Sequence, residues 1–383
     1  MKKTFCVFIV CIILVISLIL PVSAENEKMP VDVRAKAAVL MDADTGRVLM
    51  EMNMNEKLYP ASVTKIMTML LVSEALDNGK ISFDDKVTAS ANAVKKGGSQ
   101  IWLKEGENMT VDELFKAMAV YSANDACTAL AELVAGSEEA FIVMMNERAA
   151  KLGMKNTHFE NCTGLDDTAE NHKTTAYDIA LMAKELMTHE FITKYTTIWM
   201  DSLRNGQTQL VNTNKLVRFY QGCTGLKTGT TSKAGCCLCA TAEREGTSLI
   251  AVVLGSDNST DRFEGAKAML NYGFANWATV VPKVNESLIA DVNISMGRER
   301  KITPQIPADF SVLIPKGREN EVTQDISLAA NVEAPVESGQ TLGKINISLD
   351  GKVLASYNLC APYYVEKTTF VSVFKDLLEV FSK

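Results

Sequence analysis

The chain has 383 residues, of which 47% are hydrophobic and 22% are charged, and its formal net charge is −7. This composition is typical of a globular protein with a substantial core, which excludes an intrinsically disordered chain, and the length allows two domains. The negative net charge gives no sign of a nucleic-acid-binding surface, so nucleic acid is not expected as a partner.

Residues 1–24 are predicted to be a secretory signal peptide. Met1–Lys3 carries two lysines, an apolar run extends from Thr4 to Leu20, and the small residues that end at Ala24 offer a cleavage site. An uncleaved membrane anchor is the alternative, but the run is slightly short for a transmembrane span. The sequence therefore predicts an exported protein whose mature chain begins at residue 25.

The region 25–282 is predicted to contain both strands and helices. Asp44–Gly46 indicates a hairpin turn, and Gly79 and Gly153 are typical of helix ends. In chain order, the expected elements are strands 37–42 and 47–52, helices 62–78, 110–134, 138–152 and 174–189, strands 238–242 and 249–254, and a helix 262–277. Strands at both ends with helices between them predict an α/β (α+β) domain, in which helices cover one mixed sheet.

Pro282 marks the predicted end of this first domain. The region 283–362 consists of short β-type runs separated by Gly, Pro and Asn, and it contains no helical pattern. Its candidate strands are residues 288–294, 311–314, 326–330, 344–349 and 353–359. We expect a small all-β, sandwich-like domain without chemistry of its own.

The last region, 363–383, is predicted to end in an amphipathic helix over Thr369–Lys383. At helical pitch its apolar residues, three phenylalanines among them, share about half of the circumference. A broad apolar face at a chain end favours insertion into a membrane interface, here the outer face of the cytoplasmic membrane. A helix that docks on the β domain or that mediates dimerisation is the alternative.

The cysteines and histidines do not predict a metal site. Seven cysteines follow Ala24, an odd number without a ligand pattern, and those between Cys236 and Cys239 alternate faces on an expected strand. They are interpreted as small buried apolar residues. His158, His172 and His189 have no paired ligand spacing and are interpreted as structural or surface residues. No metal or cofactor is therefore expected.

Ser62 and Lys65 form a Ser-x-x-Lys pair at the start of a predicted helix. Residues three apart share a helix face, so the amine can lie beside the hydroxyl. A lysine that is desolvated in a cleft has a lowered pKa and can take the proton of a serine, and the helix N-terminus presents free N–H groups nearby. The pair predicts Ser62 as nucleophile and Lys65 as general base. It is weak by itself, because Ser372 and Lys375 repeat the spacing.

A second short motif, Ser122-Ala123-Asn124, follows the first along the chain. Ser122 can relay a proton between Lys65 and a leaving amine, and Asn124 can orient Lys65 and hold a substrate amide.

The third motif is Lys227-Thr228-Gly229, expected on a strand at the edge of the cleft. Lys227 and Thr228 can bind a terminal carboxylate, and Gly229 allows the substrate backbone to approach closely. The backbone N–H groups of Ser62 and Thr230 can form an oxyanion hole. The three motifs in this order are the parts that acyl transfer without histidine requires.

These residues resemble those of the low-molecular-mass penicillin-binding proteins that are D-alanyl-D-alanine carboxypeptidases, the peptidase S11 group. The resemblance extends over about 240 residues, from Ala38 to Trp277. It rests on the segments Pro60–Thr68, Tyr121–Ala126 and Gly225–Thr231 with Ala234-Gly235, and on the intervening landmarks Met145-Asn146, Leu152–Met154, Asn156–Phe159 and Gly164–Asp167. Cys162 and Thr163 depart from the family pattern, which puts the local loop shape in doubt.

The resemblance implies a serine-type hydrolase of the β-lactamase/transpeptidase-like fold, with an antiparallel sheet between helical layers. Ser62 would attack the D-Ala–D-Ala bond of peptidoglycan stem peptides and release D-alanine, and β-lactams would acylate the same serine. A trailing β domain and an amphipathic C-terminal helix also look like this family.

Three other functions remain open from the sequence. A β-lactamase shares the motif order, but no Glu-x-x-x-Asn occurs between Ser122 and Lys227 to drive fast deacylation. A DD-endopeptidase that cleaves cross-links would use the same residues. A membrane-attached wall-binding protein with a silent site is the alternative outside the enzymes, although all of the motif residues are intact.

Overall fold

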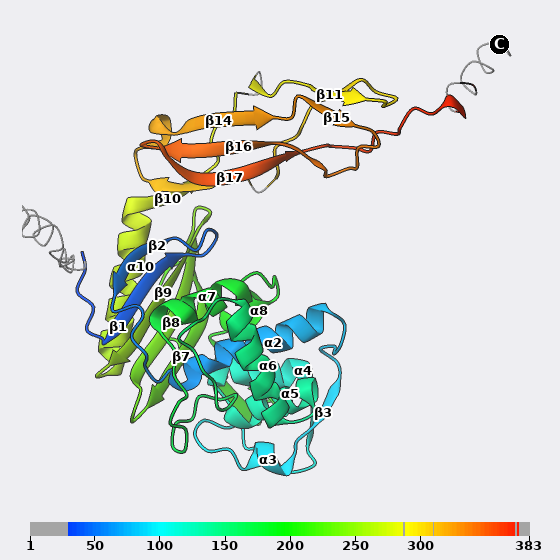
Figure 1. Cartoon of the computed structure of the whole chain (residues 1–383). Helices are drawn as coiled ribbons and strands as arrows, with labels where there is room; N and C mark the ends of the chain where they lie inside the picture. The colour runs from blue at the N-terminus through cyan, green and yellow to red at the C-terminus, as the bar shows by residue number, and fades with distance from the viewer. Residues whose placement is uncertain (1–29, 286–287, 309, 372–373, 375–383) are drawn as a thin grey trace, which may run out of the picture.

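The computed structural model describes residues 30–285, 288–308, 310–371 and 374. The predicted signal peptide lies outside these residues, as does most of the predicted helix over 369–383. The described chain has two regions, a mixed α/β region that carries the three motifs and an elongated β region that follows it (Figure 1).

The first region is built on a five-stranded antiparallel sheet with the order β2-β1-β9-β8-β7. Neighbouring residues of a strand point to opposite faces, and in β1 Val39 and Met41 enter one core while Ala38 and Leu40 enter another. The sheet is therefore buried on both faces. Its strands are β1 (Ala37–Asp42), β2 (Val48–Met52), β7 (Cys223–Thr231), β8 (Gly235–Arg244) and β9 (Thr247–Ser256).

Helices cover both faces of this sheet, which confirms the predicted fold class. The helix α10 packs on one face against β8 and β9, and the remaining larger helices lie on the other side (Figure 1). The bounds of the helices are α2 (Lys65–Asp77), α3 (Ala91–Val94), α4 (Val111–Lys116), α5 (Asn124–Ala135), α6 (Glu138–Lys151), α7 (Ala176–Leu186), α8 (Ile192–Thr196), α9 (Leu216–Phe219) and α10 (Ser259–Asn276).

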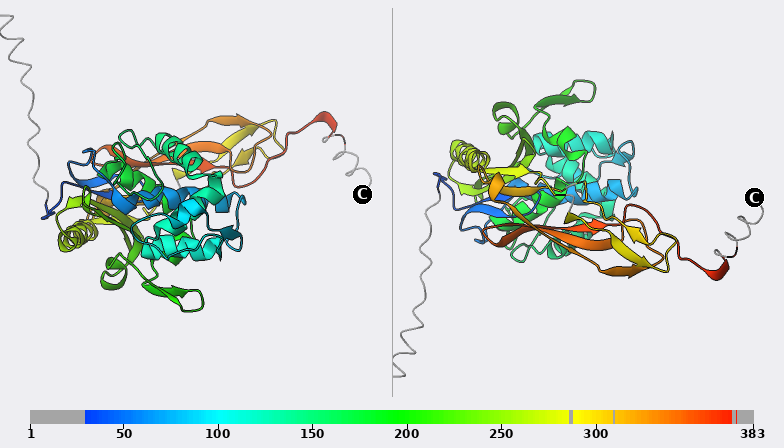
Figure 2. Two further views of the ribbon diagram at one scale, coloured as in Figure 1. Left: turned by 90° about the horizontal axis from the view of Figure 1, so that it is seen from below. Right: turned by 90° about the horizontal axis from the view of Figure 1, so that it is seen from above.

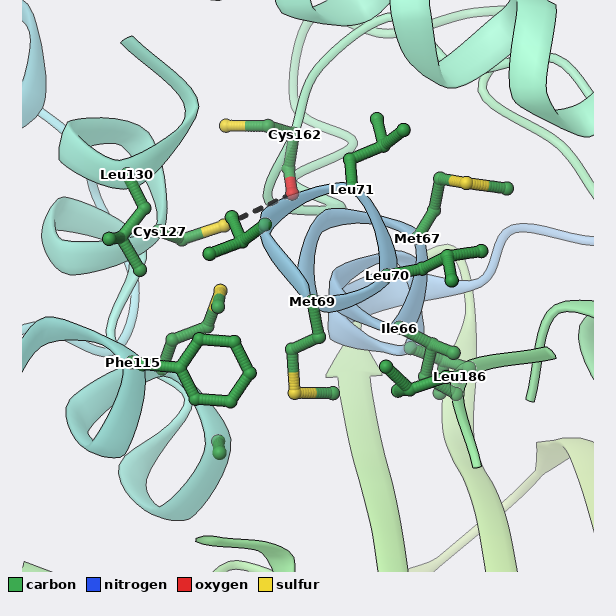
Figure 3. Packing of buried hydrophobic residues seen from close by; sticks show 14 of the residues in the cluster. Ile66, Met67, Met69, Leu70, Leu71, Phe115, Cys127, Leu130, Cys162 and Leu186 are labelled. Atoms are coloured by element: carbon green, nitrogen blue, oxygen red, sulfur yellow. Dashed lines mark hydrogen bonds between the residues drawn. The ribbon is translucent and has the colours of Figure 1, made fainter. Parts of the chain in front are cut away.

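The helix α2 passes through the centre of the helical layer. Its apolar side chains point in several directions, toward Phe115, Leu130 and Leu186 on neighbouring helices (Figure 3). A helix that is apolar all round is buried all round. This burial fixes the position of Lys65, the first residue of α2.

The prediction of one helix over 110–134 is wrong. The structure has α4, a π-helix η2 (Ala117–Tyr121), a break at Ser122 and then α5. Ser122 is left-handed, with φ 68° and ψ 26°. The Ala123 N–H then donates back to Ala117 O at 3.2 Å, and the Asn124 N–H donates to Ser99 O at 2.7 Å. The apolar pattern does not reveal the break because residues on both sides of it are buried in the same core.

Two short antiparallel strand pairs and a 3-10 helix complete the first region. They are β3 (Lys86–Thr88) with β4 (Asn108–Thr110), β5 (Met200–Leu203) with β6 (Thr208–Val211), and η1 (Ala61–Thr64) immediately before α2. None of the four short strands was expected from the sequence, since each has only three or four residues.

The described residues of the second region form mainly strands, as predicted. It contains two three-stranded sheets, with the orders β12-β11-β15 and β14-β16-β17, and each is lined by its own apolar cluster. The elements are β10 (Trp277–Val280), β11 (Val292–Ser295), β12 (Lys301–Ile302), β13 (Val312–Pro315), η4 (Glu319–Glu321), β14 (Thr323–Leu328), β15 (Asn331–Glu333), β16 (Thr341–Leu349) and β17 (Lys352–Cys360). Its last described residues extend away from the first region (Figure 2).

The two regions meet where α10 ends. The expected helix 262–277 ends at Asn276, and Trp277 instead begins β10, which pairs with β13. The guanidinium of Arg47, in the β1–β2 turn, lies 4.5 Å from the centre of the Trp277 ring. Strand pairing with the second region thus starts a few residues before Pro282. Among the described residues, no helix has both the length and the apolar character that crossing a bilayer requires.

Candidate active site

Ser62 and Lys65 lie side by side, as their spacing predicts. Ser62 belongs to η1 and is partly exposed, whereas Lys65 at the start of α2 is fully buried. The Lys65 Nζ lies 3.0 Å from the Ser62 Oγ. A substrate can therefore reach the hydroxyl while the amine stays shielded from water.

The surroundings of Lys65 lower the pKa of its amine. Burial is the main cause, and it is opposed in part by the buried thiols of Cys127 and Cys162 and by Asp125. The amine also donates to Thr163 O at 2.7 Å. A lysine with a lowered pKa and one hydrogen bond to a fixed carbonyl is suited to accept a proton from Ser62.

The second motif lies where the helix is interrupted between η2 and α5. Ser122 is 4% exposed, and η2 packs against α2, the helix that carries Lys65. The Asn124 Nδ2 donates to Gly97 O at 2.6 Å, while the buried Asn124 Oδ1 has no partner among the described residues. In the described structure the Lys65 amine bonds Ser62 and Thr163 rather than Asn124. A buried amide oxygen without a partner is unusual and is available as a hydrogen-bond acceptor.

The third motif lies on a strand, as expected, and this strand, β7, is at one edge of the sheet. Lys227 is 1% exposed, and its pKa lies well below the ordinary lysine value because of burial and of the nearby Lys65 amine. Its Nζ donates to Thr228 O at 3.1 Å. The Thr228 hydroxyl donates to Thr213 Oγ1 at 2.7 Å. Thr213 is half-buried, and the hydroxyl pair is a ready donor set for a carboxylate.

Gly229 lets two segments of this chain approach each other. A Cβ built on it would lie 2.8 Å from Pro60 O and 2.9 Å from Ser62 N. From its sequence, Gly229 was expected to let the substrate backbone approach closely. In the structure it also makes room for the backbone of the nucleophile, Ser62. The third motif and the first motif are thereby in direct contact.

Arg262 supports this contact from the other side of the sheet edge. It lies on α10 and donates from Nη1 to Gly229 O at 3.0 Å and to Thr230 Oγ1 at 2.9 Å. The same nitrogen lies 3.3 Å from Cys237 O on β8. The guanidinium therefore holds the segment Gly229–Thr230 in place relative to the neighbouring strand.

The loop between α6 and α7 packs against the segment that carries Ser62 and Lys65. Gly164 packs so closely on Ala61 that a Cβ would lie 1.8 Å from Ala61 O. Asp166 accepts a short hydrogen bond from Thr231 on β7. Cys162 and Thr163, where the family pattern is not followed, are also tied in, because Cys162 O accepts from Thr68 Oγ1 at 2.7 Å and Thr163 O holds Lys65.

His172 fastens the same loop and is structural, as predicted. Its Nδ1 accepts from Glu160 N at 3.0 Å, so Nε2 carries the proton and donates to Thr64 Oγ1 at 2.8 Å. Burial lowers the pKa of His172 to about 4, with smaller effects of His158 and Lys65. The ring is therefore neutral at physiological pH.

Sequence reasoning missed three of these residues. Thr163 acts through its backbone carbonyl, which has no sequence signal. Thr213 follows an unexpected hairpin and is brought to Thr228 only by the tertiary fold. Arg262 could have been found, because a charge that shares a helix face with apolar Ala266 and Met269 is unusual.

Within the described residues, no three His, Cys, Asp or Glu side chains are arranged to hold a metal ion. The seven cysteines of the described chain are free, and five of them are buried. The Ser62 hydroxyl lies beside the buried Lys65 amine, and the third motif contacts the Ser62 backbone through Gly229. This set can carry out nucleophilic acyl transfer.

Two family models match the chain. The peptidase S11 model, described as D-alanyl-D-alanine carboxypeptidase, matches residues 23–258, and the model of the penicillin-binding protein 5 C-terminal domain matches residues 279–367. The D-alanyl-D-alanine carboxypeptidase DacF of Bacillus subtilis (strain 168) is 44% identical over 345 residues, which are 89% of this chain and 88% of the relative.

Solved structures agree with these matches. Penicillin-binding protein 5 from Haemophilus influenzae has a TM-score of 0.75 and 32% identity, over 88% of this chain and 99% of that chain. Penicillin-binding protein D2 from Listeria monocytogenes, in its ampicillin-bound form, has a TM-score of 0.58 and 33% identity, over 63% of this chain and 98% of that chain.

Proposed function

The chain belongs to the peptidase S11 family of D-alanyl-D-alanine carboxypeptidases, and we propose that Ser62 is the nucleophile through which it acts. The protein is a serine-type carboxypeptidase that removes the terminal D-alanine from peptidoglycan stem peptides, and it binds penicillin. The observation that carries the assignment of Ser62 is its 3.0 Å contact with a buried lysine of lowered pKa.

The first step is acylation of Ser62. Lys65 takes the hydroxyl proton while Oγ attacks the carbonyl carbon of the penultimate D-alanine. The proton passes through Ser122 to the leaving amine, the C–N bond breaks, and D-alanine departs. Water then hydrolyses the ester and restores Ser62, with Lys65 again as the base.

Three groups position the substrate in this proposal. Lys227 and the hydroxyl pair Thr228–Thr213 bind the terminal carboxylate, whose charge favours the protonated form of Lys227. The free Oδ1 of Asn124 accepts from a substrate amide. The N–H groups of Ser62 and Thr230 stabilise the oxyanion.

We also propose that the β-lactam ester turns over slowly. Two buried carboxylates near the site already accept hydrogen bonds from this chain. Asp125 accepts from the N–H groups of Ile101 and Leu103, and Asp166 accepts from the Thr231 hydroxyl. Neither is free to activate water as a class A β-lactamase glutamate does. Rapid steady-state hydrolysis of penicillin would contradict this part of the proposal.

Mass spectrometry after incubation with benzylpenicillin tests the nucleophile. The mass should rise by one equivalent of the drug, and peptide mapping should locate the adduct on Ser62. Ser62→Ala should take no label and release no D-alanine from a D-Ala–D-Ala pentapeptide. Ser327→Ala, an exposed serine in β14, is the matched control and should behave as the wild type. An adduct that persists in Ser62→Ala refutes the assignment.

We further propose that the protein is exported by its first 24 residues and attached to the outer face of the membrane by residues 369–383. Phe370, Val371 and Phe374 are all more than half exposed, and the rings of Phe370 and Phe374 stack 6.2 Å apart. Aromatic side chains gathered at a chain end support an interfacial helix.

Flotation with vesicles of phosphatidylcholine and phosphatidylglycerol tests the attachment. The mature chain should float with the vesicles, and a chain that ends at Thr368 should stay behind while its carboxypeptidase rate is unchanged. Equal flotation of the two chains would exclude the anchor.

A further inference from the structure

Two segments that pair with each other form the end of the second region opposite β10 (Figure 1). One segment, residues 296–301, makes the turn from β11 into β12, and the other, residues 363–368, is the stretch through which the chain leaves the fold. They are joined through their backbones, since the Thr368 N–H donates to Met296 O at 2.6 Å. We call the two segments together the distal surface.

Amphipathic side chains are exposed on the distal surface. Met296, Tyr363 and Tyr364 are 53%, 44% and 51% exposed. Met296 has a φ of 57°, which is uncommon for any residue except glycine, and the bond from Thr368 to its carbonyl holds the turn in this shape. Tyrosine is enriched at the boundary between a bilayer and water, where its ring is buried and its hydroxyl stays hydrated. The exposed side chains of this surface are therefore suited to a membrane interface.

The distal surface carries more cations than acids, although the whole chain has a net charge of −7. Its charged side chains are four cations and two carboxylates, namely Arg298, Arg300, Lys301 and Lys367 with Glu299 and Glu366. Two of the cations are paired with carboxylates. Arg300 and Lys301 are exposed, and neither forms an ion pair within the described part of the chain. These two charges are therefore available to bind an anionic partner.

The chain passes from the distal surface directly into the proposed membrane anchor. Thr368 is the last residue of the surface, and the anchor segment begins at the next residue. Phe370, which is 84% exposed, is two residues away, and two Cα–Cα steps cover at most about 8 Å. Charges act over about the same distance in physiological salt. When Phe370 lies in the interface, the Thr368 end of the distal surface is thus within electrostatic reach of the lipid head groups.

The side chains of the anchor segment supply no net charge of their own. Within Thr369–Lys383 two lysines are balanced by one aspartate and one glutamate. Any attraction to anionic lipid therefore has to come from outside this segment, and the exposed cations of the distal surface can supply it. A lysine or arginine close to an anionic bilayer strengthens binding about fivefold.

We propose that the distal surface is a second membrane contact, which binds anionic phospholipid head groups through Arg300 and Lys301 and places Met296 and Tyr364 in the interface. The contact adds to the anchor and does not replace it, because two cations give only a modest gain in binding. The inference rests on the proposed attachment by residues 369–383 and deepens it, since it names the lipid class. Two neighbouring contacts would also fix the orientation of the second region, which could otherwise turn about a single point.

Flotation of the full mature chain with two kinds of vesicle tests this contact. Vesicles of phosphatidylcholine alone report the anchor, and vesicles that also contain phosphatidylglycerol report the anchor together with the head-group contact. The wild type should bind the anionic vesicles more tightly, and rising salt should remove the difference. The double variant Arg300→Gln, Lys301→Gln should bind the anionic vesicles about 25-fold more weakly, with about fivefold from each cation. Its binding to neutral vesicles and its carboxypeptidase rate should stay unchanged.

The double variant Lys86→Gln, Lys155→Gln is the matched control. It removes two exposed lysines of the first region, and it should bind both kinds of vesicle as the wild type does. Hydrogen exchange of the wild type locates the contact, because the amides of residues 296–301 should exchange more slowly on anionic vesicles than on neutral ones.

Three results would overturn the second contact. They are equal binding of the wild type and the Arg300→Gln, Lys301→Gln variant to anionic vesicles, an equal loss of binding in the control, and unchanged exchange at residues 296–301. A wild type that floats with neither kind of vesicle would instead overturn the proposed attachment itself. The failure of the second contact is therefore distinguishable from the failure of the anchor.

Discussion

The two regions of this protein differ in whether they bury ionisable side chains. In the first region Lys65, Lys227 and Asp125 are at most 1% exposed, and the pKa values of both lysines are lowered by burial. In the second region the ion pairs lie at the surface, as in the pair of Arg318 with Asp350. Buried ionisable groups with shifted pKa values are typical of functional sites, whereas exposed ion pairs add little to the stability of the fold.

Glycine shows the same contrast between function and folding. Gly229 lets β7 approach the backbone of Ser62, so it joins two catalytic segments. Gly343 in β16 also has no room for a side chain, because a Cβ would lie 2.5 Å from Ser327 O, but there it only allows two strands to pack. The first region is thus organised around a site, and the second around its own small cores.

Replacing the buried amine should give the largest difference between the regions. Lys65→Met keeps the length of the side chain but removes the base, so acylation by penicillin should slow by about 10²- to 10⁴-fold. Lys367→Met in the second region, where the lysine is paired with Glu333, should leave the rate unchanged. Stopped-flow or quench measurements of the acylation rate check both. Equal rates in Lys65→Met and the wild type would remove Lys65 from the mechanism.

The pH dependence of acylation should report the same amine. Only the neutral amine accepts a proton, so the rate should rise as pH increases through the pKa of Lys65. Because burial lowers that pKa, the rise should lie below the range of an ordinary lysine. A rate that levels off only near the ordinary lysine pKa would contradict the proposed state of the amine.

Acid stability should depend on His172, a residue of the first region. Its native pKa of about 4 lies below the ordinary 6.5, so between these values the unfolded chain binds more protons. Above pH 6.5 this group therefore does not change the free energy of unfolding. As the pH drops from 6.5 to 4, the free energy of unfolding should fall by about 3 kcal/mol in total. Urea unfolding at pH 7, 5.5 and 4 measures the change.

The variant His172→Gln should flatten this part of the stability profile, since the titrating group is gone. His189→Gln, whose ring pairs with Asp77 near the surface, is the control and should keep it. An unaltered slope in His172→Gln would show that another group is responsible.

The two glycines should separate activity from local stability. Gly229→Ala should displace Ser62 from the partners that activate it and lower the acylation rate about 10- to 100-fold. Gly343→Ala should loosen the β14–β16 pairing while acylation stays at the wild-type rate. Acylation kinetics and hydrogen exchange of the second region distinguish the outcomes. A slow Gly343→Ala enzyme would mean that the regions are coupled.

The smallest effect is expected for Arg318. Its contacts with Glu321 and Asp350 are exposed, and water solvates the separated charges well. Arg318→Gln should leave both the denaturation midpoint and the acylation rate unchanged within error. A clear loss of stability would show that this surface pair contributes more than its exposure suggests.

Much of the first region could be predicted from the sequence. The bounds of β1 were predicted without error, because a short apolar run followed by a glycine turn indicates a hairpin locally. The helix 138–152 was placed to within one residue with the help of its glycine stop, Gly153. The second region was predicted less well, and β12 and β15 were missed because strands of two or three residues carry no pattern.

The sequence by itself determined which chemical groups this protein has and which of them are close because they are close in the chain. The proximity of Ser62 and Lys65, one helical turn apart, follows from their spacing alone. Only the tertiary structure decided how distant segments meet. The break at Ser122, the carbonyl of Thr163 on Lys65 and the hydroxyl of Thr213 on Thr228 depend on contacts between residues far apart in the chain. Local propensity cannot encode such contacts, because they form only when a shared core brings the segments together.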